Sequence, residues 1–363
     1  MIKPRIKKIC IVVSSLGGGG AERASGLLSK ILYNLGHEVH VVSVMDNIEF
    51  PYSGQLLNLG ALKPKKNTIG SRISRYGVLK RYLAQHNFDY IIDTRTRIGS
   101  LKEFIISKFL YKARQTIYVV HSSNLKAYLN TSKRLGKLLY GNAHRIVAVS
   151  NSIAKKIEDI YKVKNVTTIY NAMDVTYVQN ENRDKREFES YILFYGRLID
   201  DIKNISLLLE AYSKSNLIQA KIKLKILGEG EDKTKLKHKV KALGLNSHVQ
   251  FLSYNTNPFQ IVSDAIFVVL TSRYEGFPMV IVESLSMGTP VVSVDCETGP
   301  NEIIIHKKNG LLVENHNAEA FANAMNLMLE DKDLYLHCKA NAAESVERFS
   351  MEKIAQQWNK LIT

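Results

Sequence analysis

Short apolar runs alternate with longer amphipathic segments along almost the whole chain, and this alternation constrains the fold more than any other feature. The apolar runs are four to six residues long and rich in Val, Ile and Leu. Such runs are typical of strands buried on both faces of a parallel sheet, because these strands have no solvent-facing side to carry polar residues. The alternation therefore predicts an α/β fold in which helices cover both faces of parallel sheets.

The expected elements form two groups of similar pattern. In the first half, strands are expected at residues 9–14, 39–44, 90–93, 116–120, 145–150 and 166–170, with helices near 21–35, 70–86, 98–113, 131–142 and 151–161. In the second half, strands are expected at 191–195, 222–227, 249–252, 266–270, 290–294 and 310–313, with helices near 204–215, 231–243, 258–263, 278–287, 317–329 and 331–361. Each group predicts a doubly wound sheet.

A polar stretch without periodic apolar residues separates the two groups at residues 176–190. A length of 363 residues also favours two domains over one. We therefore expect a first Rossmann-like domain at 1–175, a linker at 176–190, a second Rossmann-like domain at 191–349 and a final helix at 350–363. Because doubly wound domains bind ligands at the carboxyl ends of their strands, we expect the site in a cleft between facing domains.

The cysteine content and the hydropathy limit the cellular context. The three cysteines, Cys10, Cys296 and Cys338, are far apart and form no CxxC pair. This spacing argues against a disulfide scaffold and a Cys-based zinc site, and it is typical of the reducing cytoplasm. The apolar run at 9–13 is too short for a signal peptide, and no apolar stretch reaches the roughly 18 residues of a membrane span.

The net charge of +16 is unevenly distributed. Residues 1–186 contain 31 Lys and Arg against 12 Asp and Glu, whereas residues 187–363 contain 19 against 22. A strongly basic first half indicates a negatively charged partner for that half.

Two motifs place phosphate-binding groups at the ends of expected strands. The glycines at 17–20 separate the first strand from the first helix, where glycine permits close backbone approach to a phosphate. They match neither GxGxxG nor a Walker A loop, so a plain glycine-rich turn is the alternative. Arg197 ends the first strand of the second half, and Lys203 begins the next helix. An anion such as a diphosphate would relieve the repulsion between these cations; two solvated surface cations are the alternative.

The segment 272–283 (Ser-Arg-Tyr-Glu-Gly-Phe-Pro-Met-Val-Ile-Val-Glu) is the most informative motif. Its acids Glu275 and Glu283 would lie about 12 Å apart along a helix, whereas a retaining glycosidase holds its two carboxyls about 5 Å apart. We therefore expect them to contact two ends of one extended ligand rather than to act as acid and nucleophile. Pro278 is expected as the first helical residue. Glu283 lies within an apolar run and requires a polar partner.

Three weaker signals also lie at strand ends. They are Gly228-Glu229-Gly230, His121 and the loop 298–302. A plain turn, a structural histidine and a simple loop are equally good interpretations of each one alone.

In this order along the chain, these motifs resemble the retaining, nucleotide-sugar-dependent glycosyltransferases of the GT-B fold. The resemblance covers essentially the whole chain, and its most specific part is the E-x7-E element with Gly-Phe-Pro inside it. The Gly-Gly-Ala-Glu-Arg turn at 19–23 is similar to that of bacterial enzymes that build lipopolysaccharide, capsule and lipid-linked oligosaccharides.

The resemblance implies a role for each matching position. It implies that Arg197 and Lys203 hold the donor diphosphate and stabilise the leaving group. It further implies that Glu275 contacts the donor sugar, that Glu283 binds the ribose, and that His121 lies near the transferred sugar and the acceptor. Other donor contacts are implied for Gly18, Gly19, Glu229, Leu252, Tyr254, Gly276, Phe277, Pro278, Met279 and Val280. The resemblance implies no metal or other cofactor, because the two cations supply the positive charge.

The implied reaction moves a hexose or N-acetylhexosamine from a nucleotide sugar, expected to be a UDP-sugar, to a hydroxyl of a glycan or lipid-linked glycan. The implied C-terminal helix crosses back to the first domain. The sequence departs from the family at one place, because members commonly carry a more compact Gly-Lys pair after the arginine. Here Asp200-Asp201-Ile202 precede Lys203, which predicts a different loop geometry.

Basic residues accompany apolar ones on the expected helices at 70–86 and 98–113. Such helices suit an anionic membrane surface, where a polyprenyl-diphosphate-linked acceptor would lie. They also suit helices that bury an apolar side in the core, and for each single helix we prefer this second interpretation. For the whole domain, the charge predicts a cytoplasmic enzyme that is peripheral on the inner face of the cell membrane.

Three rival functions account for parts of the sequence. A basic nucleic-acid- or membrane-binding protein without enzyme activity would explain the charge. Its nucleic-acid form predicts interleaved aromatic residues or a helix-turn-helix, which we do not find, so no nucleic-acid partner is expected. An NAD-dependent oxidoreductase lacks its GxGxxG motif here. A catalytically inactive sugar-binding homologue would not need the charged positions, all of which are present.

Overall fold

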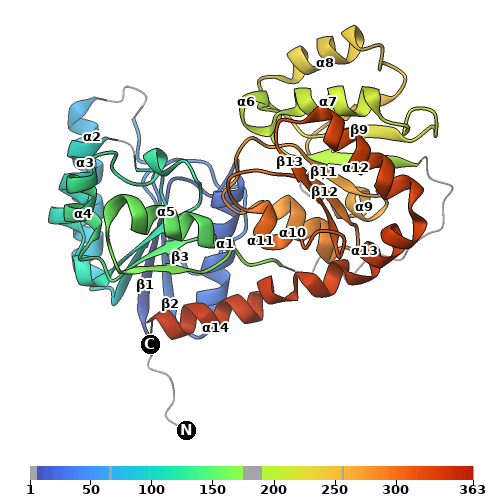
Figure 1. The fold of residues 1–363 in the computed structure, drawn as a ribbon. Helices are drawn as coiled ribbons and strands as arrows, with labels where there is room; N and C mark the ends of the chain where they lie inside the picture. The colour runs from blue at the N-terminus through green and yellow to red at the C-terminus, as the bar shows by residue number, and fades with distance from the viewer. Residues whose placement is uncertain (1–5, 65–67, 98, 175–189, 256, 363) are drawn as a thin grey trace. The chain divides into compact units, whose positions relative to one another are not determined.

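The computed structural model describes residues 6–64, 68–97, 99–174, 190–255 and 257–362. The chain divides into two compact units (Figure 1). The first unit comprises Met1–Ala172 and Met351–Thr363, and the second comprises Met173–Ser350. The first unit therefore ends three residues earlier than the expected boundary at 175. The expected linker at 176–190 lies outside the described residues, apart from Ser190.

Seven parallel strands form the sheet of the first unit, in the order β3-β2-β1-β4-β5-β6-β7. The strands are β1 (Lys8–Val13), β2 (Glu38–Ser43), β3 (Gln55–Asn58), β4 (Tyr90–Asp93), β5 (Thr116–Val120), β6 (Arg145–Ala148) and β7 (Val166–Thr168). The helices are α1 (Gly20–Asn34), α2 (Ile69–His86), α3 (Ser100–Ile105), α4 (Lys133–Tyr140), α5 (Asn151–Tyr161) and α14 (Met351–Ile362). Three shorter helical turns are η1 (Ile106–Leu110), η2 (Ala113–Gln115) and η3 (Leu125–Ala127).

Two elements of the first unit differ from the sequence-based expectation. The edge strand β3 was not expected, because its four residues carry no β-branched side chain and are half exposed. The single helix expected at 98–113 is wrong: α3 ends at Ile105, and a π-helical turn, η1, replaces its continuation. The shorter element leaves several of its apolar side chains in solvent, which matters below.

The C-terminal helix α14 belongs to the first unit, where it packs against α1 (Figure 1). Its buried residues Ile354, Trp358 and Ile362 are spaced four apart and therefore lie on one side of the helix. The ring nitrogen Nε2 of His144 lies 3.2 Å from the carbonyl oxygen of Leu361 and adds a polar contact near the end of the chain.

Six parallel strands form the sheet of the second unit, in the order β10-β9-β8-β11-β12-β13. They are β8 (Tyr191–Tyr195), β9 (Lys223–Leu227), β10 (Val249–Leu252), β11 (Val268–Leu270), β12 (Val291–Asp295) and β13 (Gly310–Glu314). The helices are α6 (Asp200–Lys203), α7 (Ile205–Lys214), α8 (Lys233–Ala242), α9 (Phe259–Ser263), α10 (Met279–Ser286), α11 (Pro300–Ile303), α12 (Ala318–Glu330) and α13 (Lys332–Ser345), followed by the turn η5 (Glu347–Phe349). Counted from β8, the strand order is the 3-2-1-4-5-6 of a Rossmann fold.

The core of the second unit is continuous and apolar. It contains Phe194, Tyr212, Phe267 and Phe321, all fully buried between the sheet and its helices. The expected tail helix at 331–361 is in fact two helices, α13 and α14, and the chain changes units at residue 350.

The structure agrees with two exclusions drawn from the sequence. All three cysteines are free and buried, so none forms a disulfide. Among the helices of the described ranges, none is both long enough and apolar enough to cross a bilayer.

Candidate active site

The centre of the candidate site in the second unit is an ion pair between two predicted residues. Lys203 Nζ donates to Glu275 Oε1 at 2.6 Å. Lys203 was expected at the start of a helix, but it is the last residue of α6. Asn204 adopts a left-handed conformation (φ 49°) and separates α6 from α7. The sequence prediction therefore assigned Lys203 to the wrong helix end; it did not include the contact with Glu275, and the roles of both residues in donor binding stay predictions.

Glu275 is held through both its carboxylate and its backbone carbonyl. Ser272 Oγ donates to Glu275 Oε1 at 2.7 Å, and the hydroxyl of Thr298 donates to the backbone carbonyl of Glu275. Gly299 (φ 99°) packs closely against the same segment. A Cβ at this position would lie only 2.6 Å from Pro278 Cδ, so the close packing requires glycine. The loop 298–302, for which the sequence favoured no role, therefore fixes the position of Glu275.

The acidic insertion before Lys203 has a structural explanation. Asp200 is buried and accepts hydrogen bonds from the backbone N–H and the hydroxyl of Ser206, at 2.8 and 2.6 Å. Burial raises the pKa of Asp200, but the hydrogen bonds from Ser206 and Lys235 outweigh it and hold the pKa below its usual range. The departure from the family pattern thus forms α6 and ties it to the first turn of α7.

Glu283 finds the polar partner that its burial requires. It lies on α10, and the hydroxyl of Tyr195, the last residue of β8, donates to Glu283 Oε2 at 3.3 Å. The same hydroxyl contacts the carbonyl oxygen of Val280 at 2.8 Å. Glu283 is only 5% exposed, and its proposed role in binding the ribose stays a prediction.

Arg197 differs from Lys203 in having no side-chain partner among the described residues. Its side chain is exposed and makes no ion pair or side-chain hydrogen bond within the described part of the chain. An unpaired guanidinium at the end of β8 has all five of its N–H donors available to an anion.

The glycines around Arg197 are required by close packing of two loops. Gly196 and Gly228 both have φ of 147°, and a Cβ on Gly228 would lie 2.0 Å from the carbonyl oxygen of Gly196. A Cβ on Gly230 would lie 2.3 Å from the carbonyl oxygen of Leu198. The Gly-Glu-Gly motif is therefore required by strand-end packing, whatever it contacts in addition.

The predicted residues for the base and ribose lie at the ends of β9 and β10. Glu229 is exposed and accepts from Lys233 Nζ at 2.7 Å. Leu252 is half-buried and Tyr254 is exposed. These side chains are accessible, and their role as donor contacts stays a prediction.

The segment before α10 combines buried and accessible groups. Pro278 is the residue before the helix rather than its first residue, so α10 begins at Met279. Gly276, Phe277 and Pro278 are buried, whereas Met279 and Val280 are half-buried. The Phe277 ring packs edge-on against Phe349 at 5.0 Å, so this ring belongs to the core, and only the backbone remains for the predicted donor contact.

The glycine-rich loop of the first unit is well defined. Gly18 has φ of 92°, and its N–H donates to Glu49 Oε2 at 3.2 Å. Gly19 precedes the first residue of α1. A phosphate that took the place of the Glu49 carboxylate at the Gly18 N–H would also lie near the N-terminus of α1. This is the contact that the sequence predicts for the loop.

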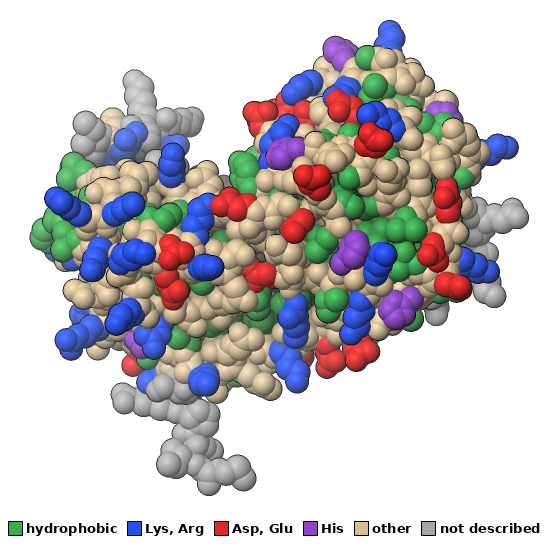
Figure 2. Space-filling model, viewed as in Figure 1, with side chains coloured by type: hydrophobic (Ala, Val, Ile, Leu, Met, Phe, Trp, Pro, Cys, Tyr) green, Lys and Arg blue, Asp and Glu red, His purple; other side chains and the backbone are tan. Residues whose placement is uncertain are grey.

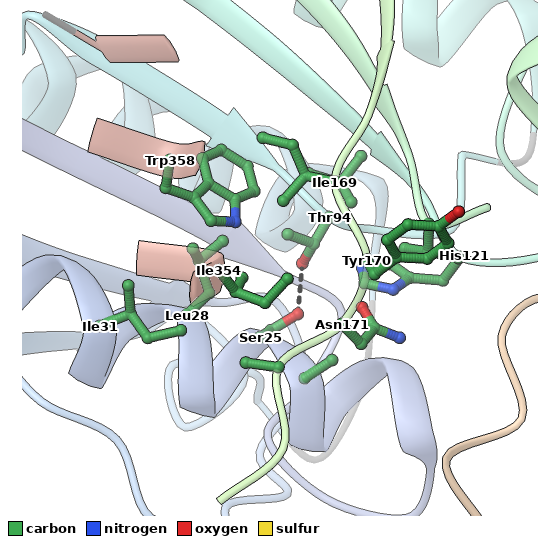
Figure 3. A pocket seen from close by; sticks show the side chains of 14 residues that line it. Ser25, Leu28, Ile31, Thr94, His121, Ile169, Tyr170, Asn171, Ile354 and Trp358 are labelled. Atoms are coloured by element: carbon green, nitrogen blue, oxygen red, sulfur yellow. Dashed lines mark hydrogen bonds between the residues drawn. The ribbon is translucent and has the colours of Figure 1, made fainter. Parts of the chain in front are cut away.

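His121 lines a small pocket at the carboxyl ends of the first sheet's strands (Figure 3). Ser25 and Thr94, joined by a hydrogen bond of 2.9 Å, lie in the same pocket, and Trp358 from α14 closes one side. The cavity volume is about 20 Å³, which is room for about one water rather than for a sugar. Both ring nitrogens of His121 are buried and have no partner in the described residues.

The environment of His121 keeps its imidazole neutral. Burial, followed by the nearby Arg97 charge, lowers the pKa of His121 to about 4. A neutral ring with two unpaired nitrogens can accept one hydrogen bond and donate another. The predicted meeting of this residue with the donor site across a cleft stays a prediction.

Sequence reasoning missed a buried charged cluster beside His121. Arg95 makes a forked ion pair with Asp93, with Nη2 2.6 Å from Oδ2, and Glu103 Oε2 lies 3.5 Å from Arg95 Nη2. Arg97 donates to the backbone carbonyls of Asp93, Val119 and Tyr128. All four charged residues are at most 4% exposed. The Asp-x-Arg-x-Arg pattern directly after a buried strand was the available signal.

Comparisons with known proteins match both halves of the chain. The model of the "Glycosyl transferases group 1" family matches residues 178–345, and that of "Glycosyltransferase Family 4" matches residues 18–177. The structure of TarM is similar over 100% of both chains, with a TM-score of 0.80 and 17% identity. Anabaena HepE in complex with UDP covers 97% of this chain and 98% of its own, with a TM-score of 0.79 and 20% identity.

Curated relatives are similar over nearly their full lengths. A Campylobacter jejuni enzyme named N-acetylgalactosamine-N,N'-diacetylbacillosaminyl-diphospho-undecaprenol 4-alpha-N-acetylgalactosaminyltransferase is 29% identical, over 97% of this chain and 98% of that protein. The amylovoran biosynthesis glycosyltransferase AmsD of Erwinia amylovora is 24% identical, over 98% and 99%. The chain belongs to the GT-B glycosyltransferases, as its two Rossmann-like sheets and the motif order predicted.

Proposed function

We propose that this glycosyltransferase moves a hexose or N-acetylhexosamine from a UDP-sugar to a hydroxyl of a glycan or polyprenyl-diphosphate-linked glycan, with retention of anomeric configuration. The observation that carries the proposal is the half-buried Lys203–Glu275 pair, together with the exposed Arg197 that follows β8 in the same unit. A leaving diphosphate needs positive charge, and a donor sugar needs a carboxylate acceptor for its hydroxyls. This one constellation offers both.

The second unit would bind the donor through side chains near the carboxyl ends of its strands. Arg197 and Lys203 would contact the diphosphate and stabilise the charge that develops as the bond between the anomeric carbon and the phosphate oxygen breaks. Glu275 would accept from sugar hydroxyls, and Glu283 would accept from the ribose while Tyr195 holds it in place. We propose that the reaction needs no metal, since two cations provide the required charge.

Retention would follow from attack on the face that the diphosphate leaves. The acceptor oxygen forms a bond to the anomeric carbon, the leaving phosphate oxygen keeps the bond electrons, and this oxygen takes the acceptor's proton. No covalent sugar–enzyme step is included, because Glu275 is engaged by Lys203 and Ser272, and Glu283 is buried beside Tyr195. His121, as a neutral imidazole, would orient the acceptor or the transferred sugar.

The proposed acceptor class rests on the relatives' names and on the charge of the first unit. One relative is named for a diphospho-undecaprenol acceptor, and another for amylovoran biosynthesis. HepE was solved with UDP. A polyprenyl diphosphate is anionic and membrane-bound, which fits the excess of 31 Lys and Arg over 12 Asp and Glu in residues 1–186.

We further propose that the first unit docks on an anionic membrane, at the inner face of the cell membrane. The supporting observation is a set of exposed apolar side chains, Leu101, Ile105, Phe109 and Leu138, with Phe109 at 67%. The first three belong to the expected helix at 98–113, whose apolar side was expected to face the core. Exposed basic residues lie on the same elements, namely Lys102, Lys108, Lys133, Arg134 and Lys137. Figure 2 shows many Lys and Arg side chains on this face of the first unit. Lys108 Nζ donates to the Leu138 carbonyl at 3.1 Å, so the apolar residues of η1 and α4 are neighbours. Exposed apolar side chains on the same elements as basic ones are suited to an interface of anionic lipid.

The decisive experiment is a panel of UDP-, GDP- and ADP-sugars with wild-type protein and Glu275→Ala, measured by nucleotide release and by NMR of the product's anomeric proton. We expect wild-type protein to release nucleotide from one of the donors and to form a product of retained anomeric configuration. In Glu275→Ala, the rate of nucleotide release is expected to fall by orders of magnitude. Thermal-shift screening distinguishes the rival functions. Stabilisation by UDP or GDP supports the transferase, and stabilisation by NAD or DNA alone would overturn it.

A further inference from the structure

Glu38, His40 and His86 bring one carboxylate and two imidazoles together near the amino ends of the first sheet's strands. One ligand atom from each of the three lies within 4.8 Å of the other two. Glu38 and His40 lie on β2, and His86 is the last residue of α2. We infer that these three residues bind a divalent transition-metal ion of the Zn²⁺ class. This site is separate from the donor site and does not depend on the proposed function.

The ligand set determines the class of metal. Two imidazole nitrogens and one carboxylate oxygen suit Zn²⁺, Co²⁺, Ni²⁺ or Cu²⁺, whereas Mg²⁺ and Ca²⁺ prefer oxygen ligands alone. Three protein ligands leave one tetrahedral position, which water can fill. Water has access, because the Glu38 side chain is 45% exposed.

His40 is already oriented as a metal-binding histidine should be. Its ring is fully buried, and its Nδ1 lies 2.5 Å from the hydroxyl of Tyr82. This contact leaves Nε2 to face Glu38 Oε1 at 2.9 Å. A hydrogen bond at the non-ligating nitrogen is the usual second partner of a metal-bound imidazole, since it fixes both the tautomer and the ring plane.

The aromatic residues around the site position the second histidine. The rings of His40 and His86 lie 4.5 Å apart, and His86 stacks on Phe88 at 5.6 Å. Phe88 also packs edge-on against His40 at 5.0 Å. One buried phenylalanine therefore holds both imidazoles close to the carboxylate.

Metal binding must displace or share one existing interaction. Glu38 Oε1 accepts from Lys8 Nζ at 2.8 Å as well as facing His40 Nε2. The ion would take the place of the proton between Glu38 and His40, and Lys8 can turn to solvent because its side chain is partly exposed. The bound ion would then join β2 to the end of α2 and stabilise the first unit rather than take part in sugar transfer, since His121 and Asp93 lie at the opposite ends of the strands.

The test uses the full chain without a histidine tag. Co²⁺ titration is followed by the visible absorption bands of the ion, and Zn²⁺ binding is followed by competition with Co²⁺ and by the thermal midpoint. We expect one Co²⁺ per chain, displacement by Zn²⁺, and a rise of the midpoint by about 3 °C or more at saturating Zn²⁺. Glu38→Gln and His86→Ala are expected to weaken binding by tenfold or more.

The matched control is His337→Ala, which removes an exposed histidine of the second unit and is expected to bind Co²⁺ like wild type. Glu38→Gln alters an exposed side chain and keeps its volume, so it tests the site even if His86→Ala fails to fold. Absence of stoichiometric binding by wild type, or unchanged affinity in Glu38→Gln and His86→Ala, would overturn the inference. Because the readout is metal binding, a negative glycosyltransferase assay leaves it standing.

Discussion

The Nζ of Lys203 lies 2.6 Å from Glu275 Oε1, and this contact joins the end of α6 to the loop before α10. The two side chains are only 18% and 12% exposed, so water screens the pair weakly. The same ammonium group can serve a donor phosphate, and the same carboxylate can serve the donor sugar. Their contact therefore fixes both side chains relative to each other, and the proposed mechanism assigns them to neighbouring parts of the donor.

Replacing Lys203 with Ala is expected to lower kcat by about 10²–10³-fold, because a cation that stabilises a developing charge in a preorganised site contributes on this order. Nucleotide release at saturating donor measures the effect. Lys239→Ala is the control, since Lys239 pairs with Glu210 on the surface and has no place in the proposed site. Equal turnover by Lys203→Ala and wild type would contradict the proposed role.

Gly228→Ala is expected to destabilise the second unit by about 3 kcal/mol or more, because its Cβ would lie 2.0 Å from the Gly196 carbonyl oxygen at a φ of 147°. The thermal midpoint measures the loss. Gly77→Ala is the matched control: this glycine is inside α2, and a Cβ added there would have no neighbouring atom within 4 Å, so alanine is expected to stabilise by up to about 1 kcal/mol. A Gly228→Ala protein as stable as wild type would show that the two loops can separate without cost.

Much of the fold was predictable from the sequence because its strands are continuous apolar runs flanked by turns. β4, β5, β8 and β10 begin and end at the expected residues. β3 was missed because an edge strand buries little and so needs no apolar run. The end of α3 was missed because a π-helical turn keeps the apolar composition of a helix while changing which side chains face the core.

The candidate site was predictable where a motif is local and not where it is built by packing. Glu275, Gly276 and Pro278 share one loop, so their spacing could be read directly. The pairing of Tyr195 with Glu283 spans 88 residues and depends on how β8 packs beside α10. Asp93 and Arg95 were overlooked because charged residues after a strand are usually solvated, and only the fold shows that these are buried.

Protonation of His121 is expected to have no effect on activity between pH 8 and pH 5, because burial and Arg97 lower its pKa to about 4. The unfolded chain binds this proton near pH 6.5, so the stability contributed by the neutral ring is complete above that pH and is lost as pH falls toward 4. NMR titration of the His121 ring measures the pKa, and His121→Asn should flatten the decline of the thermal midpoint over this window. A measured pKa near 6.5 would contradict the buried, unpaired environment.

Replacing both Leu101 and Phe109 with Ser is expected to reduce binding to vesicles containing anionic lipid by tenfold or more, with little effect on stability, because both side chains are exposed. Co-sedimentation with phosphatidylglycerol-containing vesicles measures this, and pure phosphatidylcholine vesicles test the need for charge. Leu336→Ser, an equally simple change at an exposed leucine of the second unit, is expected to bind like wild type. Undiminished binding by the double variant would place the membrane contact elsewhere or show that charge alone accounts for it.

Replacing Asp93 with Asn is expected to destabilise the first unit by about 3–5 kcal/mol, because it leaves the buried Arg95 without its forked carboxylate partner. Burial raises the pKa of Asp93, but Arg95 and Arg97 outweigh it and hold the pKa below its usual range, so the carboxylate is charged at neutral pH. The thermal and urea midpoints measure the effect. Asp159→Asn is the control, since Asp159 and Lys162 form an exposed pair at 3.9 Å whose loss is expected to cost less than about 0.5 kcal/mol. Equal midpoints for the two variants would mean that water or Glu103 compensates Arg95, and would contradict the stabilising role of the Asp93–Arg95 pair.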